Sequence, residues 1–282
     1  MPARGVSEPI LTDDDRAVWS AWMRAAGEHA RTRAHARRVD AAKRIIDAAR
    51  AAATPWCVAW SGGKDSTVLT HLACVEMGHP LHVFAHKDDL DFPESEPYIL
   101  RSAEAWGITV RIVRPPISPA AWMRDHAREH SSAGLIEMHA RTSELAKLAW
   151  WDTIDRETHD FAGYFDGLCS HESRARALNR ATRGNLYEKS HRTRGSIFVA
   201  HPLHDWKPID VYGYCAARGI ELLPLYQCVA LLHSAEPWRL REEWWVPSEK
   251  GARHGQVAWL KRYYPSLYRQ LCAWMPDARM HA

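Results

Sequence analysis

The sequence predicts an α/β protein: a Rossmann-like parallel sheet of about five strands flanked by helices. One observation is that, between residues 54 and 113, short apolar runs alternate with longer amphipathic segments. A second is the turn signal Gly62-Gly63 between the first apolar run and the segment that follows it. Strand, helix and strand in this order are typical of parallel sheets with right-handed crossovers.

An N-terminal helical extension, residues 1–53, precedes the predicted sheet. Residues 12–53 are rich in Ala, Arg and charge and contain no Pro. Thr12 or Asp13 can cap a helix, and the aspartates at its start suit the positive end of the helix dipole. Apolar residues then recur at helical spacing, so we predict one long helix or two shorter ones that end before Pro55.

The sheet and its helices are expected within residues 54–226. The strands are expected at residues 56–60, 81–86, 108–113, 163–168 and 196–200. The helices are expected at residues 65–77, 93–106, 119–130, 172–182 and 208–218. Gly78, Gly107 and Gly219 each end one of these helices. Residues 131–160 look helical but contain few of the Gly and Pro residues that mark the ends of helices and strands.

Residues 227–282 are aromatic and are expected to form a mainly helical, Trp-rich appendage. The chain has 14 Trp residues, and the pairs Trp150-Trp151 and Trp244-Trp245 favour core or interface packing over base stacking. The N-terminal and C-terminal segments suggest a surface for a second copy of the chain or for a partner protein.

Composition indicates an ordinary globular protein, with 46% hydrophobic residues, 25% charged residues and a formal net charge of +3. So small a charge does not predict a nucleic-acid coat. The six cysteines are widely spaced, which predicts free thiols in a reducing compartment. No apolar run approaches a membrane span of ~18 residues, and residues 1–15 are polar and acidic, unlike a secretory signal. We therefore expect a cytoplasmic location and no membrane contact.

The strongest functional signal is the glycine loop, Ser61-Gly62-Gly63-Lys64-Asp65-Ser66. It leaves a predicted strand and opens a predicted helix. Its two glycines permit backbone conformations closed to other residues and let an anion approach closely. The first helical turn presents N–H groups without intrahelical acceptors, Lys64 adds a charge that we expect to face solvent, and Ser61 and Ser66 add hydroxyl groups. These features predict a phosphate site at the carboxyl end of a parallel strand.

The string SGGKDST, residues 61–67, resembles the PP-loop of ATP pyrophosphatases, in the adenine nucleotide alpha-hydrolase-like superfamily. Three further segments narrow the resemblance to the phosphoadenosine-phosphosulfate reductase family. Residues 86–95 are similar to that family's acidic residue followed by F-P-E-T. Residues 167–176 resemble its G-x-R-x-x-E-S-x-x-R-A loop, and residues 202–212 resemble its P-L-x-D-W-T-x-x-D-V-W segment. The four ordered matches cover residues 56–226, about 60% of the chain.

The resemblance implies an enzyme that binds ATP or a related adenine nucleotide and cleaves it between the α and β phosphates. It places the nucleotide-binding residues on the matching motifs: Ser61, Gly62, Gly63, Lys64, Asp65, Ser66, Asp88, Asp89, Gly167, Glu172, Ser173 and Arg176. Lys64, Asp65 and Arg176 are the expected catalytic residues, and Asp65 is the carboxylate expected near Mg²⁺. The leading hypothesis is adenylyl transfer, with release of pyrophosphate, to an acceptor that is a small molecule or a nucleic-acid base.

Departures from the family pattern leave two alternatives open. Cys169 stands where the family places Arg, and the family's C-terminal E-C-G-x-H motif is absent, since Cys272 lies in Gln-Leu-Cys-Ala. The closely spaced cysteines of iron–sulfur members are also absent from the sequence. One alternative is sulfonucleotide (PAPS/APS) reductase or sulfurtransferase chemistry through Cys169 or Cys272. The other is a nucleotide-binding module without turnover that serves a partner complex.

Two further groups of residues are rich in ionisable side chains. A basic stretch consists of Arg174, Arg176, Arg180, Arg183, Lys189, Arg192 and Arg194. Its members are expected to bind phosphate or pyrophosphate, to hold a nucleic acid, or to form a solvated face. Among 17 histidines, His201 and His204 lie three apart, but no group has metal-ligand spacing with supporting cysteines, so the sequence does not favour zinc.

Overall fold

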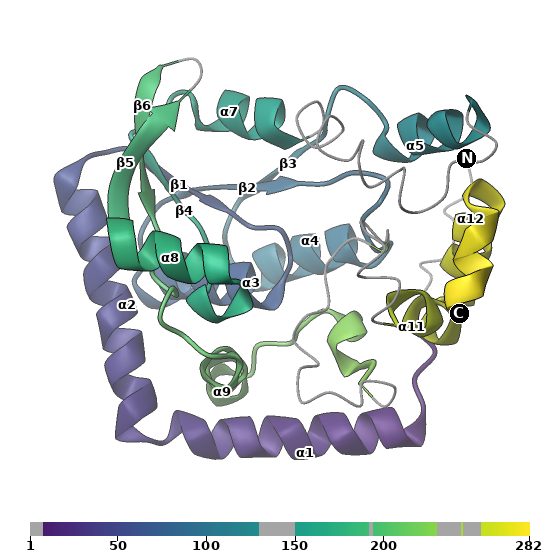
Figure 1. Cartoon of the computed structure of the whole chain (residues 1–282). Coiled ribbons are helices and arrows are strands. Elements are labelled where there is room, and N and C mark those ends of the chain that lie inside the picture. The colour runs from purple at the N-terminus through teal and green to yellow at the C-terminus, as the bar shows by residue number, and fades with distance from the viewer. Residues whose placement is uncertain (1–7, 130–149, 192–193, 230–243, 245–254) are drawn as a thin grey trace.

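The computed structural model describes residues 8–129, 150–191, 194–229, 244 and 255–282. A six-stranded sheet with the order β3-β2-β1-β4-β6-β5 forms its centre (Figure 1). The strands are β1 (Trp56–Ala59), β2 (His82–His86), β3 (Val110–Val113), β4 (Gly163–Phe165), β5 (Leu186–His191) and β6 (Gly195–Ala200). All neighbouring strands are parallel except β5, which is antiparallel to β6. The predicted α/β fold class is confirmed.

Helices flank the sheet, and Figure 1 shows α7 on one side and α4 and α9 on the other. This division agrees with right-handed crossovers in both halves of the sheet. The helices and short helical turns are α1 (Asp13–Ala30), α2 (Arg33–Ala52), α3 (Lys64–Thr70), η1 (His71–Glu76), α4 (Ser95–Trp106), α5 (Pro119–Glu129), α7 (Asp152–Thr158), η3 (Ser170–Glu172), α8 (Arg174–Arg183), α9 (Pro208–Arg218), η4 (Pro224–Gln227), α11 (Gln256–Tyr263), α12 (Pro265–Trp274) and η6 (Pro276–His281).

Strand β5 was not predicted from the sequence. It pairs with β6 from Leu186↔Ala200 to His191↔Gly195 and forms the edge of the sheet. Most of its residues are partly or fully exposed, and its sequence LYEKSH is largely polar. An edge strand that faces water on one side lacks the continuous apolar run that identified the buried parallel strands.

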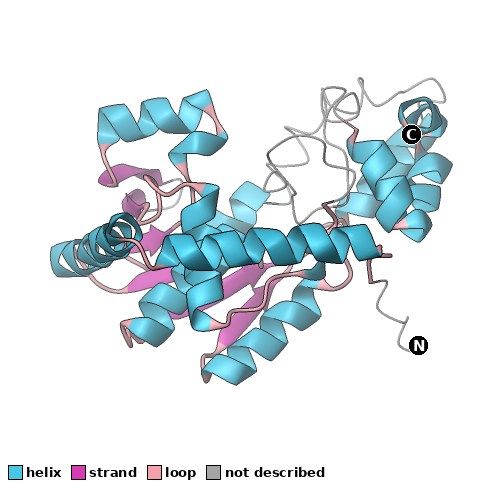
Figure 2. Ribbon diagram, turned by 90° about the horizontal axis from the view of Figure 1, so that it is seen from below, coloured by secondary structure: helices cyan, strands magenta, loops and turns pink. Residues whose placement is uncertain are grey.

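The N-terminal segment forms two helices, which was one of the two predicted arrangements. Thr12 caps α1: its hydroxyl accepts from Asp15 N at 3.1 Å, and the Asp15 carboxylate accepts from Thr12 N at 2.9 Å. Helix α1 packs along α9, where a Cβ on Gly213 would lie 3.0 Å from Ala26 O. Figure 2 shows α1 crossing the molecule in front of the sheet. The amide of Ile10 also donates to the α11 carbonyl of Tyr263 at 3.0 Å, so the N-terminal and C-terminal segments contact each other.

Tryptophan packing follows the expectation only in part. Trp244 is buried and its ring lies 5.3 Å from that of Trp274, whereas Trp151 is exposed. All six cysteines are free thiols. Within the described residues, no helix combines the length and apolarity that crossing a membrane requires. Some residues of the sequence-based predictions lie outside the described part of the chain: 130–149, Arg192 and Trp245.

Glu76 joins three helical segments of the N-terminal and sheet regions. Its carboxylate pairs with Lys43 Nζ on α2 at 2.6 Å and with Arg218 Nε on α9 at 2.5 Å. It also accepts a hydrogen bond from the Tyr214 hydroxyl at 2.8 Å. Burial raises the pKa of Glu76, but hydrogen bonds with Arg218 and the two other partners outweigh burial and lower the pKa to about 2.

Changing Glu76 to Gln should lower the free energy of unfolding at pH 7 by about 1–3 kcal/mol, because three donors lose a charged acceptor. A carboxylate with a depressed folded pKa stabilises the fold above its ordinary pKa of 4.5, and this contribution is lost as the pH falls towards about 2. Urea unfolding at pH 7 and pH 3 measures the effect. The gap between parent and Glu76→Gln should narrow at pH 3, and a gap that stays constant would contradict the assignment.

Candidate functional site

Two loops meet where the strand order of the sheet reverses. The glycine loop follows β1, and a second loop, residues 166–173, follows β4. The chain runs outward from β1 to β2 and β3, and then returns to β4 on the opposite side of β1. Both loops therefore leave the carboxyl ends of adjacent parallel strands at a topological switch point. Open α/β sheets bind their ligands at this position.

The conformation of the glycine loop depends on Gly62 and on serine hydroxyls. Gly62 has a φ of 99°, a left-handed conformation that favours glycine. A Cβ at this residue would lie 3.2 Å from Ser95 Oγ and from Ile99 Cδ1. The hydroxyls of Ser61 and Ser66 lie 2.9 Å apart in a hydrogen bond across the loop. The loop is thus a compact turn with its first and last side chains joined.

The start of α3 presents backbone donors to the loop. The first helical hydrogen bond runs from Thr67 N to Gly63 O at 2.8 Å, so the amides of Lys64, Asp65 and Ser66 have no acceptor within the helix. The Lys64 amide donates to the buried Tyr226 hydroxyl at 3.0 Å. The other two amides lie at the positive end of the helix dipole, an arrangement that suits an anion.

Lys64 does not face solvent, contrary to the prediction. Its side chain is buried, with 2% of the residue exposed, and its ammonium group pairs with the Asp65 carboxylate. Burial is the largest single effect and lowers the pKa of Lys64, but the charge and hydrogen bond of Asp65, together with Tyr212 and Cys169, outweigh burial and the pKa is raised. Residues from another part of the chain also surround this lysine. The loop after β4 reaches the start of α3, and Glu172 Oε1 lies 3.9 Å from Lys64 Nζ.

Gly167 lies against the backbone of the glycine loop. A Cβ at this position would lie 2.9 Å from Ser66 N and 3.0 Å from the carbonyl carbon of Asp65. Only a residue without a side chain allows this approach, because real Cβ atoms do not come so close to backbone. Gly167 therefore sets the distance between the two loops and leaves the Ser66 amide uncovered by a side chain at this position.

Glu172 and Arg176 connect the second loop to Lys64. The Glu172 carboxylate pairs with the Arg176 guanidinium and lies near the Lys64 ammonium. Ser173 caps α8, since its hydroxyl accepts from the Arg176 amide at 3.2 Å. The structure therefore brings Lys64, Glu172 and Arg176 together, and it gives Ser173 a role in starting the helix that carries Arg176.

The third motif segment, residues 202–212, holds the second loop in place. The amide of Ser170 donates to the His204 carbonyl at 2.8 Å. The His171 Nδ1 atom lies 3.1 Å from the carbonyl oxygen of Trp206. These contacts place the second loop against the third motif segment, although the two are separate in the chain.

Cys169 contacts the glycine loop as a thiol rather than as a thiolate. Its Sγ lies 3.5 Å from Asp65 Oδ1, and its side chain is fully buried. Burial raises the pKa of the Cys169 thiol well above its ordinary value, and the charge of Asp65 adds to the shift. The nucleophilic form of cysteine is the thiolate, so this environment disfavours Cys169 as a nucleophile.

Asp88 and Asp89 follow β2 and take part in local hydrogen bonds. Asp88 accepts from Leu90 N at 2.8 Å, and Asp89 accepts from Ala120 N at 2.9 Å at the start of α5. In the described part of the chain, neither aspartate forms a hydrogen bond or ion pair with the glycine loop. The structure thus assigns both of them turn and capping contacts, and a role in nucleotide binding stays a prediction.

Lys87 is a candidate that sequence reasoning did not single out. It is buried at the end of β2, and its Nζ donates to Ser95 Oγ at 2.7 Å and pairs with Asp91 at 3.2 Å. The same Ser95 hydroxyl lies against Gly62. A lysine directly after a buried parallel strand next to the switch point was the available signal.

Members of the basic stretch have partners within the protein. Arg180 binds the Asp205 carboxylate through two nitrogens at 3.1 and 3.0 Å. Arg183 and Lys189 lie over tyrosine rings, and Arg194 donates to backbone carbonyls. Arg176 is the member connected to the glycine loop, through Glu172. Of the six members that the structure describes, all but the exposed Arg174 thus have a partner shown within the protein.

The fold and these contacts define a class: α/β proteins that gather a glycine loop, the backbone amides at a helix start and a lysine at a topological switch point. The family model described as the phosphoadenosine phosphosulfate reductase domain matches residues 55–230, well over half of the chain. The chain belongs to this family.

Comparison with individual proteins gives more distant similarities. The chain is 28% identical over 227 residues to sulfate adenylyltransferase subunit 2 of Streptomyces lavendulae, with 73% of this chain covered and 66% of the relative. It therefore spans just under two thirds of that relative's length.

Two solved structures are similar to the chain. One is a phosphoadenylyl-sulfate reductase from Candida auris in a phosphate complex, with a TM-score of 0.47 and 14% identity, covering 66% of this chain and 83% of that chain. The other is the FMN adenylyltransferase of Candida glabrata in complex with ATP, with a TM-score of 0.48 and 12% identity, covering 73% and 66%.

Proposed function

We propose that this chain is an adenylyl-transfer enzyme whose glycine loop is a PP-loop that binds ATP. It cleaves ATP between the α and β phosphates, passes AMP to an acceptor and releases pyrophosphate. The observation that carries the proposal is the position of Lys64, on the first turn of α3 and at the switch point between β1 and β4. Membership of the family and the name of the Streptomyces relative, an adenylyltransferase subunit, support an adenine nucleotide as the ligand.

The contacts around Lys64 suggest how phosphate charge is neutralised. Lys64 and Arg176 already share the Glu172 carboxylate, so two cations converge beside the free amides of α3. A bound triphosphate would share these two cations with Glu172, since phosphate oxygens accept charge-assisted hydrogen bonds from Lys and Arg as carboxylates do. Catalysis then consists of positioning and charge stabilisation at the leaving pyrophosphate.

Asp65 is the residue that would hold Mg²⁺ together with phosphate oxygens. Mg²⁺ prefers oxygen ligands and is commonly bound through one or two carboxylates plus substrate phosphates, a donor set that fits Asp65 beside the loop. When bound, the ion supplies positive charge to the phosphates. In the reaction an acceptor oxygen bonds to the α-phosphorus, and the bond from that phosphorus to the α–β bridging oxygen breaks as pyrophosphate leaves.

Incubating the full chain with Mg²⁺, α-labelled ATP and a small-molecule extract tests the proposal. We expect pyrophosphate and an adenylylated product in equal amounts, and mass spectrometry of that product identifies the acceptor. Cys169→Ser should retain turnover, which separates this reaction from thiol chemistry. Release of phosphate and ADP without pyrophosphate or AMP products would contradict adenylyl transfer, and tight ATP binding without any product would favour a binding module.

A further inference from the structure

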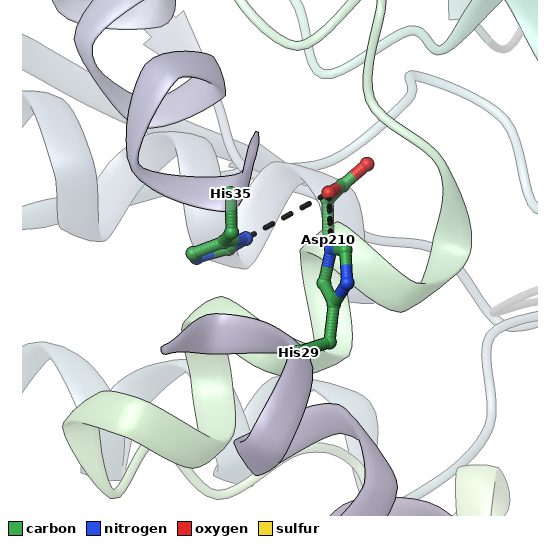
Figure 3. Close-up of side chains that lie close together, drawn as sticks. All are labelled: His29, His35 and Asp210. Carbon is green, nitrogen blue, oxygen red and sulfur yellow. Dashed lines mark hydrogen bonds and ion pairs between the residues drawn. The ribbon is translucent and has the colours of Figure 1, made fainter. Parts of the chain in front are cut away.

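A group of two imidazoles and one carboxylate lies where α1, α2 and α9 meet (Figure 3). His29 is in the last turn of α1, His35 in the first turn of α2, and Asp210 in the first turn of α9. His29 Nε2 lies 2.7 Å from Asp210 Oδ1, and His35 Nδ1 lies 3.7 Å from the same oxygen. One ligand atom from each residue lies within 4.8 Å of the other two.

The His35 ring is buried without a hydrogen-bond partner. Its side chain is 4% exposed, and neither ring nitrogen has a partner within hydrogen-bond distance among the described residues. Buried polar atoms in folded proteins nearly always have a partner, and the 3.7 Å between His35 Nδ1 and Asp210 Oδ1 is longer than a hydrogen bond, so this nitrogen is available to a ligand. The His29 side chain, by contrast, is 25% exposed, so solvent reaches the group from that side.

The two oxygens of Asp210 have different surroundings. Oδ2 accepts from Lys207 N at 2.8 Å and pairs with Arg38 Nε at 3.2 Å, which fixes the carboxylate. Oδ1 is directed at the two imidazoles, as the dashed lines in Figure 3 show. A metal-binding carboxylate is commonly held in this way, with one oxygen free for the metal and the other fixed by outer contacts.

We propose that His29, His35 and Asp210 bind a divalent transition-metal ion, with zinc as the first candidate and a solvent molecule as fourth ligand on the His29 side. Imidazole nitrogens and a carboxylate oxygen are typical zinc ligands, whereas Mg²⁺ and Ca²⁺ prefer oxygen alone. In a tetrahedral zinc site with bonds of about 2.0–2.1 Å, neighbouring ligand atoms lie about 3.3 Å apart. The distances from Asp210 Oδ1 lie on either side of this value, so small side-chain movements complete the site.

The nearby Arg38 guanidinium narrows the kind of ion that fits. Its positive charge offsets the negative charge of Asp210, so the site attracts a cation only weakly by charge. The two imidazoles must therefore supply most of the affinity for the ion. This favours zinc over ions that depend on negative oxygen ligands. The ion would join α1 and α2 to α9 by linking His29 to a residue 181 positions away in the chain. Because the site exists in the folded chain and not in the unfolded chain, zinc binding would stabilise the folded state.

The test uses the full chain after removal of metal with a chelator. Titration with Zn²⁺ against a chromophoric competitor should give one tight site per chain, and Co²⁺ should give the intense visible absorption of tetrahedral coordination. His29→Gln should weaken zinc binding at least about hundredfold, since even outer contacts of a metal ligand are worth 10- to 100-fold. His29 is chosen because its side chain is the most exposed of the three, so the change disturbs packing least.

Two further variants make the result specific. His79→Gln removes a histidine that also pairs with a carboxylate, Asp47 at 3.3 Å, and it should leave zinc affinity unchanged. His29→Cys preserves a zinc ligand at the same position and should retain binding. Zinc should raise the melting temperature of the parent and of His79→Gln but not that of His29→Gln. Equal zinc affinity in the parent and in folded His29→Gln would overturn the proposal, as would the absence of any tight site in the parent.

Discussion

Replacing Lys64 with Met is expected to raise the Kd for ATP about ten- to hundredfold. A charge-assisted phosphate contact is worth about 1.5–3 kcal/mol, and about 1.4 kcal/mol corresponds to a factor of ten. Met keeps most of the side-chain length and so avoids the cavity that Ala would leave at this buried position. Because Asp65 loses its partner, we also expect the free energy of unfolding to fall by about 1–3 kcal/mol.

Calorimetric titration with ATP, at a temperature where thermal melts show each variant folded, measures the effect. Lys64→Arg keeps the charge and should retain most of the affinity. Lys43→Met is the control, because it also removes a lysine from an ion pair. The partner of Lys43 is Glu76, the last residue of η1, so this change should leave the Kd for ATP unchanged. A folded Lys64→Met protein that binds ATP as tightly as the parent would contradict the role of the glycine loop.

Changing Gly167 to Ala should weaken ATP binding at least about tenfold and also destabilise the fold. The new methyl group would lie 2.9 Å from Ser66 N, so either the glycine loop or the loop after β4 must move. Overpacking of this kind costs about 1–3 kcal/mol. If the first turn of α3 is displaced, its amides no longer point at the bound phosphates. The loss of one charge-assisted contact to phosphate alone raises the Kd for ATP about tenfold.

Gly27→Ala is the matched control for this change. Gly27 lies inside α1, where a Cβ would meet Ala216 Cβ at an ordinary 3.8 Å. Helix propensity then predicts a gain of about 0.5–1 kcal/mol and no change in ATP affinity. The two Gly→Ala changes should therefore shift the melting temperature in opposite directions. If Gly167→Ala melts and binds ATP like the parent, the close approach of the two loops has no functional importance.

The parts of the fold that sequence reasoning predicted are those with local signals. Strands β1 to β4 and β6 appear as apolar runs because both faces of a parallel sheet are buried, and the glycine loop appears as a string between a strand and a helix. Strand β5 lacked such a signal, since one side of this edge strand faces water. Local patterns thus predicted five of the six strands, including β3 at one edge of the sheet, and missed β5 at the other edge.

The surroundings of the site depended on contacts that sequence spacing does not encode. Residues distant in the chain surround Lys64: Glu172 Oε1 lies 3.9 Å from its ammonium group, and the Lys64 amide meets the hydroxyl of Tyr226, 162 residues away. Gly167 was predicted to bind nucleotide, which stays a prediction, and its close approach to the loop backbone was not foreseen from the sequence. The His29 and Asp210 pair lies across 181 residues, beyond any motif with fixed spacing. Tertiary packing, rather than pattern, decides these features.

A crystal structure of the chain with Mg²⁺ and an ATP analogue that has a non-cleavable α–β bridge tests the central claim most directly. The account predicts the triphosphate at the first turn of α3, with phosphate oxygens within hydrogen-bond distance of the Asp65 and Ser66 amides and of Lys64 Nζ. It also predicts that the Lys64 ammonium shares its pairing between Asp65 and phosphate. An analogue bound elsewhere on the chain, with residues 61–66 free of phosphate, would contradict the account.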